Sequence, residues 1–161
     1  MQRTAARLIL RAGLVLVALS ASPAGGQGTP VWTEKMSEGF VSLSYGSLDS
    51  EQPVLQLSCF NEMEIAVLNI FGTIEGARPG QKLGIELSAG STKASLEGEV
   101  TLDDKTGAIF AEASGIEVKP VLAVLKAQGP VAVKTGEISQ TLSDVGRAEA
   151  VEKFGKDCTL Q

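Results

Sequence analysis

The feature that most restricts the fold of this chain is an alternation of apolar and polar residues with a period of two. The longest example runs from Lys93 to Leu102, where every second residue is apolar or glycine and the others are charged or polar. Successive side chains of a β-strand point to opposite faces, so this pattern predicts a strand with one buried face. Six shorter segments of strand character lie at residues 38–46, 54–60, 63–71, 82–87, 108–113 and 130–134.

The pattern changes in the C-terminal half, where two helices are expected. Residues 121–128 form an apolar, helix-forming run that ends at Gly129. The second helix is expected to begin at Ser143 as N-cap, with Asp144 in its first turn, and to end at Gly155. About seven short strands with two short helices predict a mainly β fold, either an antiparallel β-sandwich or an open barrel.

Residues 1–26 have the layout of a secretory signal peptide. Three arginines and no acidic residue come first, then a short apolar run, then small residues. The apolar run is about half of the ~20 residues that a spanning helix needs, so no permanent membrane span is expected after cleavage. Cleavage after Ser20, Ala24 or Gly26 fits equally well. The sequence therefore predicts a periplasmic or secreted protein.

The remainder of the chain is short and acidic. Residues 27–31 have the composition of a linker, and residues 32–161 have the length of one domain. Without residues 1–26 the chain has eleven basic and nineteen acidic residues, a net charge of −8. Phosphate backbones repel a domain of this charge, so nucleic acid is not an expected partner.

The chain has two cysteines, Cys59 and Cys158. In an exported protein, two cysteines most simply form one disulfide. A bridge that closes a loop of roughly 100 residues stabilises by about 4–5 kcal/mol in the chain-entropy description, before any strain is subtracted. The alternatives are a bridge between two chains or a redox role, and the second lacks both a CxxC motif and a histidine to activate a thiolate.

Histidine is absent from the whole chain. Its absence excludes Ser-His-Asp and Cys-His catalysis and removes the commonest ligand of zinc and copper. No catalytic residue, metal site or cofactor is predicted. Carboxylate pairs at Glu62/Glu64 and Glu97/Glu99, and serines near lysines, leave a hydrolase as an alternative. The i, i+2 spacing places each carboxylate pair on a solvated strand face.

Three residues are candidate ligand or partner contacts. On a helical wheel, Arg147 shares a side with Ala148 and Phe154, and a charge on a packing face must be paired, reach solvent or contact a ligand. Trp32 and Tyr45 are the only tryptophan and tyrosine in the sequence, and such rings are favoured at interfaces. Ion pairing for Arg147 and core packing for the two rings are the structural alternatives.

The order of several features resembles a known family. Trp32 near the mature start, the segment Pro53-Val-Leu-Gln-Leu-Ser-Cys59, a Gly-Pro-Val run after a helix, and the stretch 143–154 followed by Cys158 resemble the exported VasI-type proteins associated with type VI secretion. The chain departs from them in having few aromatic residues. The resemblance implies a non-enzymatic envelope domain with a Cys–Cys staple, and no functional residue is carried over from it.

These observations predict a non-catalytic binding or interaction module outside the cytoplasm, whose partner is an unknown envelope protein. A carrier of a small apolar or lipid-like ligand is the first alternative. A carboxylate- or Ser/Lys-based hydrolase is the second.

Overall fold

The computed structural model describes residues 28–50 and 52–160. The predicted signal peptide, residues 1–26, lies outside the described residues, as does Gln27 of the predicted linker. Residues 28–30 have no regular structure, and the first strand begins at Val31. No helix of the described segments is long and apolar enough to cross a membrane.

The described residues form nine strands, two α-helices and one short 3-10 helix. The mainly β class predicted from the sequence is confirmed, although the strands number nine rather than about seven. In chain order the elements are β1 (Val31–Ser37), β2 (Phe40–Gly46), β3 (Leu55–Phe60), η1 (Asn61–Met63), β4 (Ile65–Phe71), β5 (Lys82–Ala89), β6 (Thr92–Leu102), β7 (Ile109–Ser114), α1 (Val118–Lys126), β8 (Val131–Thr135), β9 (Ile138–Leu142) and α2 (Arg147–Asp157).

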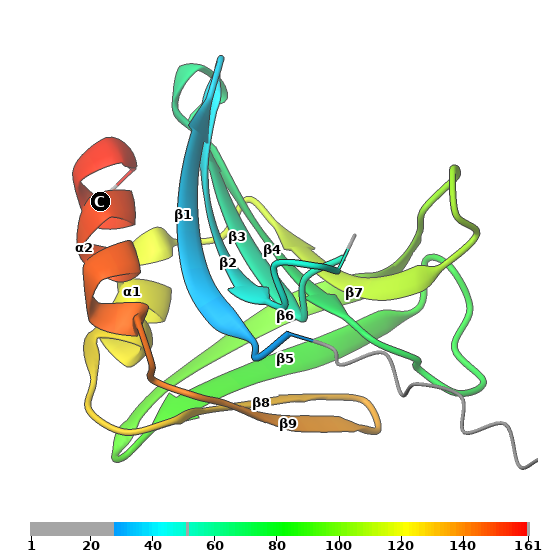
Figure 1. The fold of residues 1–161 in the computed structure, drawn as a ribbon. Coiled ribbons are helices and arrows are strands. Elements are labelled where there is room, and N and C mark those ends of the chain that lie inside the picture. The colour runs from blue at the N-terminus through cyan, green and yellow to red at the C-terminus, as the bar shows by residue number, and fades with distance from the viewer. Residues whose placement is uncertain (1–27, 51, 161) are drawn as a thin grey trace, which may run out of the picture.

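All nine strands belong to one antiparallel sheet with the order β1-β2-β3-β4-β7-β6-β5-β8-β9. The sheet is strongly curved and open, with β1 at one edge and β9 at the other (Figure 1). Hairpins connect most neighbours, and the exchange of β7 with β5 in the order is the main departure from a simple meander. Such a sheet has one concave face that needs covering.

The two strands that the sequence pattern missed are the two edge strands. In β1 only Trp32 is buried, and in β9 only Ile138 and Leu142 are. An edge strand buries fewer side chains than a central one, so it lacks the clean alternation that identifies the interior strands. The period-two pattern therefore found the centre of the sheet and not its borders.

Both helices cover the concave face and complete a single hydrophobic core. α2 packs on β1 and β2, α1 packs on β5 and β6, and the helices contact each other. Figure 1 shows them side by side at one side of the sheet. α1 contributes five buried residues to this core, Val118, Val121, Leu122, Val124 and Leu125.

The start and end predicted for the second helix are wrong. α2 begins at Arg147, because Ser143 and Asp144 form a separate turn in which the Ser143 hydroxyl accepts from the Val145 amide at 3.2 Å. Gly146 follows with φ of 77°, a left-handed conformation that glycine adopts without a steric penalty. At the other end the helix continues through Gly155 to Asp157, since one glycine in a helix costs only about 1 kcal/mol.

Candidate binding groove

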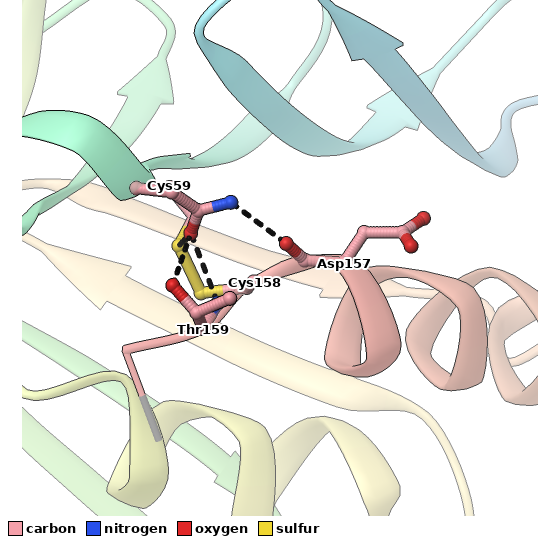
Figure 2. The surroundings of a disulfide bond; sticks show 5 residues. Cys59, Asp157, Cys158 and Thr159 are labelled. Carbon is pink, nitrogen blue, oxygen red and sulfur yellow. Dashed lines mark hydrogen bonds between the residues drawn. A yellow bond between two sulfur atoms is a disulfide. The ribbon is translucent and has the colours of Figure 1, made fainter.

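The predicted disulfide joins Cys59 in β3 to Cys158, the residue after α2. Their Cα atoms are 5.7 Å apart, and both residues are buried. Figure 2 shows the bridge at the end of α2, with Asp157 and Thr159 on either side of Cys158. The bridge therefore attaches the C-terminal end of α2 to β3, an interior strand of the sheet.

Asn61 reinforces this junction, and the sequence pattern did not identify it. Its amide nitrogen donates to the Asp157 carbonyl at 2.8 Å, and its amide oxygen accepts from the Thr159 backbone N–H at 2.9 Å. The strand pattern leaves residues 61–62 as a connection between two predicted strands, and in the structure residues 61–63 form η1. The one sequence signal was that Asn61 lies two residues after a bridging cysteine.

Trp32 and Tyr45 hold the chain just before α2. The buried Trp32 indole N–H donates to the Ser143 carbonyl at 2.6 Å, and the Ser143 amide donates to the Tyr45 hydroxyl at 3.1 Å. The two rings lie 5.1 Å apart between their centroids. Together they satisfy both backbone polar groups of Ser143. Ser143 follows β9, whereas Trp32 and Tyr45 belong to β1 and β2 at the opposite edge of the sheet.

Arg147 lies on the buried face of α2, as the helical wheel predicted. It is only 4 % exposed and lies on the same face as Val151 and Phe154, at i, i+4 and i+7. Its Nη2 donates to the carbonyl of Ala127, the C-cap of α1, where a positive charge complements the helix dipole. Ala148 was expected on this face as well, but it is exposed, because one residue along a helix turns the side chain by about 100°.

A groove of about 830 Å³ separates the C-terminal end of α1 from α2. Its walls combine small or apolar residues with Arg147 and with long charged side chains. The lining residues are Leu125, Lys126, Ala127, Gln128, Gly129, Asp144, Arg147, Ala148, Val151, Glu152, Gly155 and Lys156. The volume is within the range of about 300–1,000 Å³ typical of small-molecule sites. Neither Trp32 nor Tyr45 lines this groove.

The charges of the groove differ in sign from those of the domain. Lys126, Arg147 and Lys156 outnumber Asp144 and Glu152, which leaves one net positive charge in the lining of an acidic protein. Lys156 forms an exposed ion pair with Glu152 at 2.8 Å. Burial lowers the pKa of Arg147, and the nearby Asp144 carboxylate partly offsets this effect. The guanidinium remains protonated at neutral pH.

A second polar hollow, of about 400 Å³, lies over β5, β6 and β7. Glu99 and Glu112 are cross-strand neighbours there, and the Lys82 ammonium lies 2.6 Å from a Glu99 carboxylate oxygen. Burial, and then repulsion by Glu99, raises the pKa of Glu112. The hydrolase alternative would use this face, where Ser114 is the one lining residue with a hydroxyl. No group of three or more cysteine, aspartate or glutamate residues among the described ones is placed to hold a metal ion.

A row of apolar side chains crosses the outer face of β2, β3 and β4. The rings of Phe40 and Phe60 lie 5.3 Å apart between centroids, and Phe60 is the register partner of Ile65. All three are partly or largely accessible to solvent. The row is a small surface of the kind that protein partners contact.

Fold and groove together define a class: a single antiparallel β domain, covered by two helices and closed by a disulfide of the kind found in proteins that fold outside the reducing cytoplasm. Comparison of the chain with protein-family models, curated proteins and solved structures found no match. The class is thus defined by the physical features of the chain itself.

Proposed function

We propose that this protein is an exported, non-catalytic binding module whose groove between α1 and α2 holds a small, largely apolar ligand. One observation carries the proposal: a groove of about 830 Å³ has a buried arginine in its wall. Binding sites for small molecules combine apolar walls with a few fixed polar groups, and Arg147 beside Leu125 and Val151 is such a combination. The absence of histidine from the chain favours binding over acid–base or nucleophilic catalysis.

The proposed site of action is the periplasm or the exterior. The signal-peptide layout of residues 1–26 supports export, and the disulfide between Cys59 and Cys158 supports folding in an oxidising compartment. The resemblance to VasI-type proteins implies the same environment. Detection of the mature protein in the periplasmic or medium fraction, and not in the cytoplasm, would agree with this proposal.

The binding test uses Nile red, an uncharged apolar dye whose fluorescence rises on burial. We expect the purified mature protein to bind the dye. Ala148→Trp should abolish binding, because Ala148 is exposed and lines the groove. Ala123→Trp is the matched control, since Ala123 is an exposed helix alanine outside the groove lining. No dye binding, or equal binding by both variants, would contradict the proposal.

A protein partner is the second candidate function, and the row of Phe40, Phe60 and Ile65 supports it. A photo-reactive amino acid at Ile65 should cross-link an envelope protein in cells, whereas the same group at the exposed Glu86 of β5 should not. Absence of any product at Ile65, or the same products at both positions, would count against this second function.

A further inference from the structure

We infer that the groove between α1 and α2 selects an amphipathic carboxylate, an apolar chain with one terminal carboxylate, and that Arg147 binds this carboxylate. The inference rests on the proposed function of the groove and adds the chemical class of its ligand. Arg147 thereby becomes the specificity-determining residue of the site.

The first argument is that Arg147 is buried without a direct ion-pair partner, although the Asp144 carboxylate is near enough to act on its charge. It is 4 % exposed and forms no ion pair with any residue in 28–50 or 52–160. Its Nη2 uses the Ala127 carbonyl, while Nη1 has no hydrogen-bond acceptor among the described residues. A buried donor without an acceptor is costly, and a buried charge needs a counter-charge. Since Asp144 forms no ion pair with Arg147 and Nη1 has no acceptor in the described part of the chain, an anionic ligand would supply the direct partner that the guanidinium lacks.

The second argument is the position of the guanidinium. Both Arg147 and its acceptor residue Ala127 line the groove, so the group that joins them lies in the groove wall. Nη1 is itself closed to solvent, so binding of an anion to it requires neighbouring side chains to move. Lys126 and Glu152 line the groove with exposed, long side chains, which can move without disturbing the core.

The third argument concerns the charge of the anion. The lining carries one net positive charge after the carboxylates of Asp144 and Glu152 are counted against its three cations. A ligand with a single negative charge neutralises the net charge of the lining. A phosphate dianion would instead leave the lining with an excess negative charge, within a domain that is already acidic. The planar fork of arginine also matches a carboxylate, to which it can donate two parallel hydrogen bonds.

The fourth argument concerns the rest of the ligand. Leu125, Ala127, Ala148 and Val151 give the groove apolar walls next to the guanidinium. An apolar chain attached to the carboxylate would cover these walls and exclude water from the ion pair, which strengthens it. Fatty carboxylates and the free C-termini of apolar peptides share this chemistry.

Isothermal titration calorimetry of the mature, oxidised protein with n-decanoate, n-decanol and n-decyl phosphate tests the inference. A charge-assisted hydrogen bond predicts that decanoate binds about 10- to 100-fold more tightly than decanol. Decyl phosphate should bind more weakly than decanoate. Decanol within about threefold of decanoate, or decyl phosphate as the tightest ligand, would overturn the inference.

Substitution of Arg147 then assigns the effect. Arg147→Met keeps the length of the side chain and should reduce the preference for decanoate over decanol to about one. Arg147→Lys should retain only part of it, because an ammonium lacks the planar fork. A full preference retained by Arg147→Met would overturn the role of this residue. The comparison of three ligands on the unaltered protein needs no variant, so it stands even if both variants unfold.

Two further comparisons separate the possible failures and sources. If Nile red does not bind, the proposed function fails; if Nile red and decanol bind but decanoate has no advantage, only the present inference fails. An acetylated leucine tripeptide with a free C-terminus, set against its C-terminal amide, distinguishes a peptide source from a fatty acid. Binding of the free peptide more tightly than decanoate assigns the peptide; the reverse order assigns the fatty acid.

Discussion

Tyr45→Phe is the most informative single change in this protein, because it removes one oxygen atom and one long-range contact. The Tyr45 hydroxyl accepts the Ser143 backbone N–H at 3.1 Å, 98 residues away in sequence. The tyrosine is 6 % exposed, so water does not readily replace the lost oxygen. An amide left without an acceptor in such a place costs about 1–2 kcal/mol of unfolding free energy.

The assay is urea unfolding followed by the fluorescence of Trp32, the only tryptophan in the sequence. Its ring centroid lies 5.1 Å from that of Tyr45, so far-UV circular dichroism should be recorded alongside to check that the local and global transitions coincide. We expect the urea concentration at the unfolding midpoint to fall, while the slope of the unfolding free energy against urea concentration is unchanged. Amide exchange at Ser143 should also accelerate in the variant.

Thr135→Val provides a matched control, since it also removes one buried hydroxyl. Thr135 is 2 % exposed, and its Oγ1 has no hydrogen-bond partner among the described residues. Replacement of an unpaired buried hydroxyl by a methyl group of the same shape should leave stability unchanged or raise it slightly. An equal loss in both variants, or a loss below about 0.3 kcal/mol in Tyr45→Phe, would refute the assigned contact.

Three further predictions concern the same fold. Replacing Cys59 and Cys158 together by alanine should lower the unfolding free energy by up to about 4–5 kcal/mol, and reduction of the native protein should reproduce the loss; an unchanged midpoint would show that the bridge is dispensable. Gly98→Ala should destabilise by about 1–3 kcal/mol, because a Cβ there would lie 2.6 Å from the backbone carbonyl oxygen of Glu112. Gly84→Ala is the control, since a Cβ at Gly84 would meet open space. Similar unfolding midpoints for both variants would refute this packing. Burial raises the pKa of Glu112, so the ionised carboxylate lowers the unfolding free energy once the pH rises above the ordinary pKa of 4.5. Glu112→Gln should therefore stabilise the protein near neutral pH and lose this advantage below about pH 4. A stability gain independent of pH would contradict this prediction.

The sequence predicted the interior of the fold because interior strands leave a strong local signal. In β6, Ala94 and Val100 are buried while Lys93, Ser95 and Glu97 are exposed, and this alternation can be read from neighbouring residues alone. β1 and β9 lack that signal because each has only one or two buried side chains. The start of α2 was missed for a different reason: Ser143 has the residue type of an N-cap, but its backbone is held by Trp32 and Tyr45.

Of the candidate groove, the sequence predicted the position of one residue, Arg147, but not the shape of the groove. The helical wheel placed Arg147 on a packing face, which is where it lies. Its acceptor, the Ala127 carbonyl, belongs to the end of another helix and leaves no mark in the sequence around Arg147. The groove itself depends on how α1 and α2 pack against each other, a tertiary property that periodicity does not report.

The contacts around α2 explain how a groove can persist beside it. The Ser143 turn before the helix is held by two aromatic side chains, and the residues after it are held by the disulfide and by Asn61. α2 is thus fixed to the sheet at both ends, independently of α1. The buried Arg147 joins the two helices, but its single bond to Ala127 leaves the walls beyond it apart. A gap maintained by attachments elsewhere in the fold does not need to close in order to stabilise the protein.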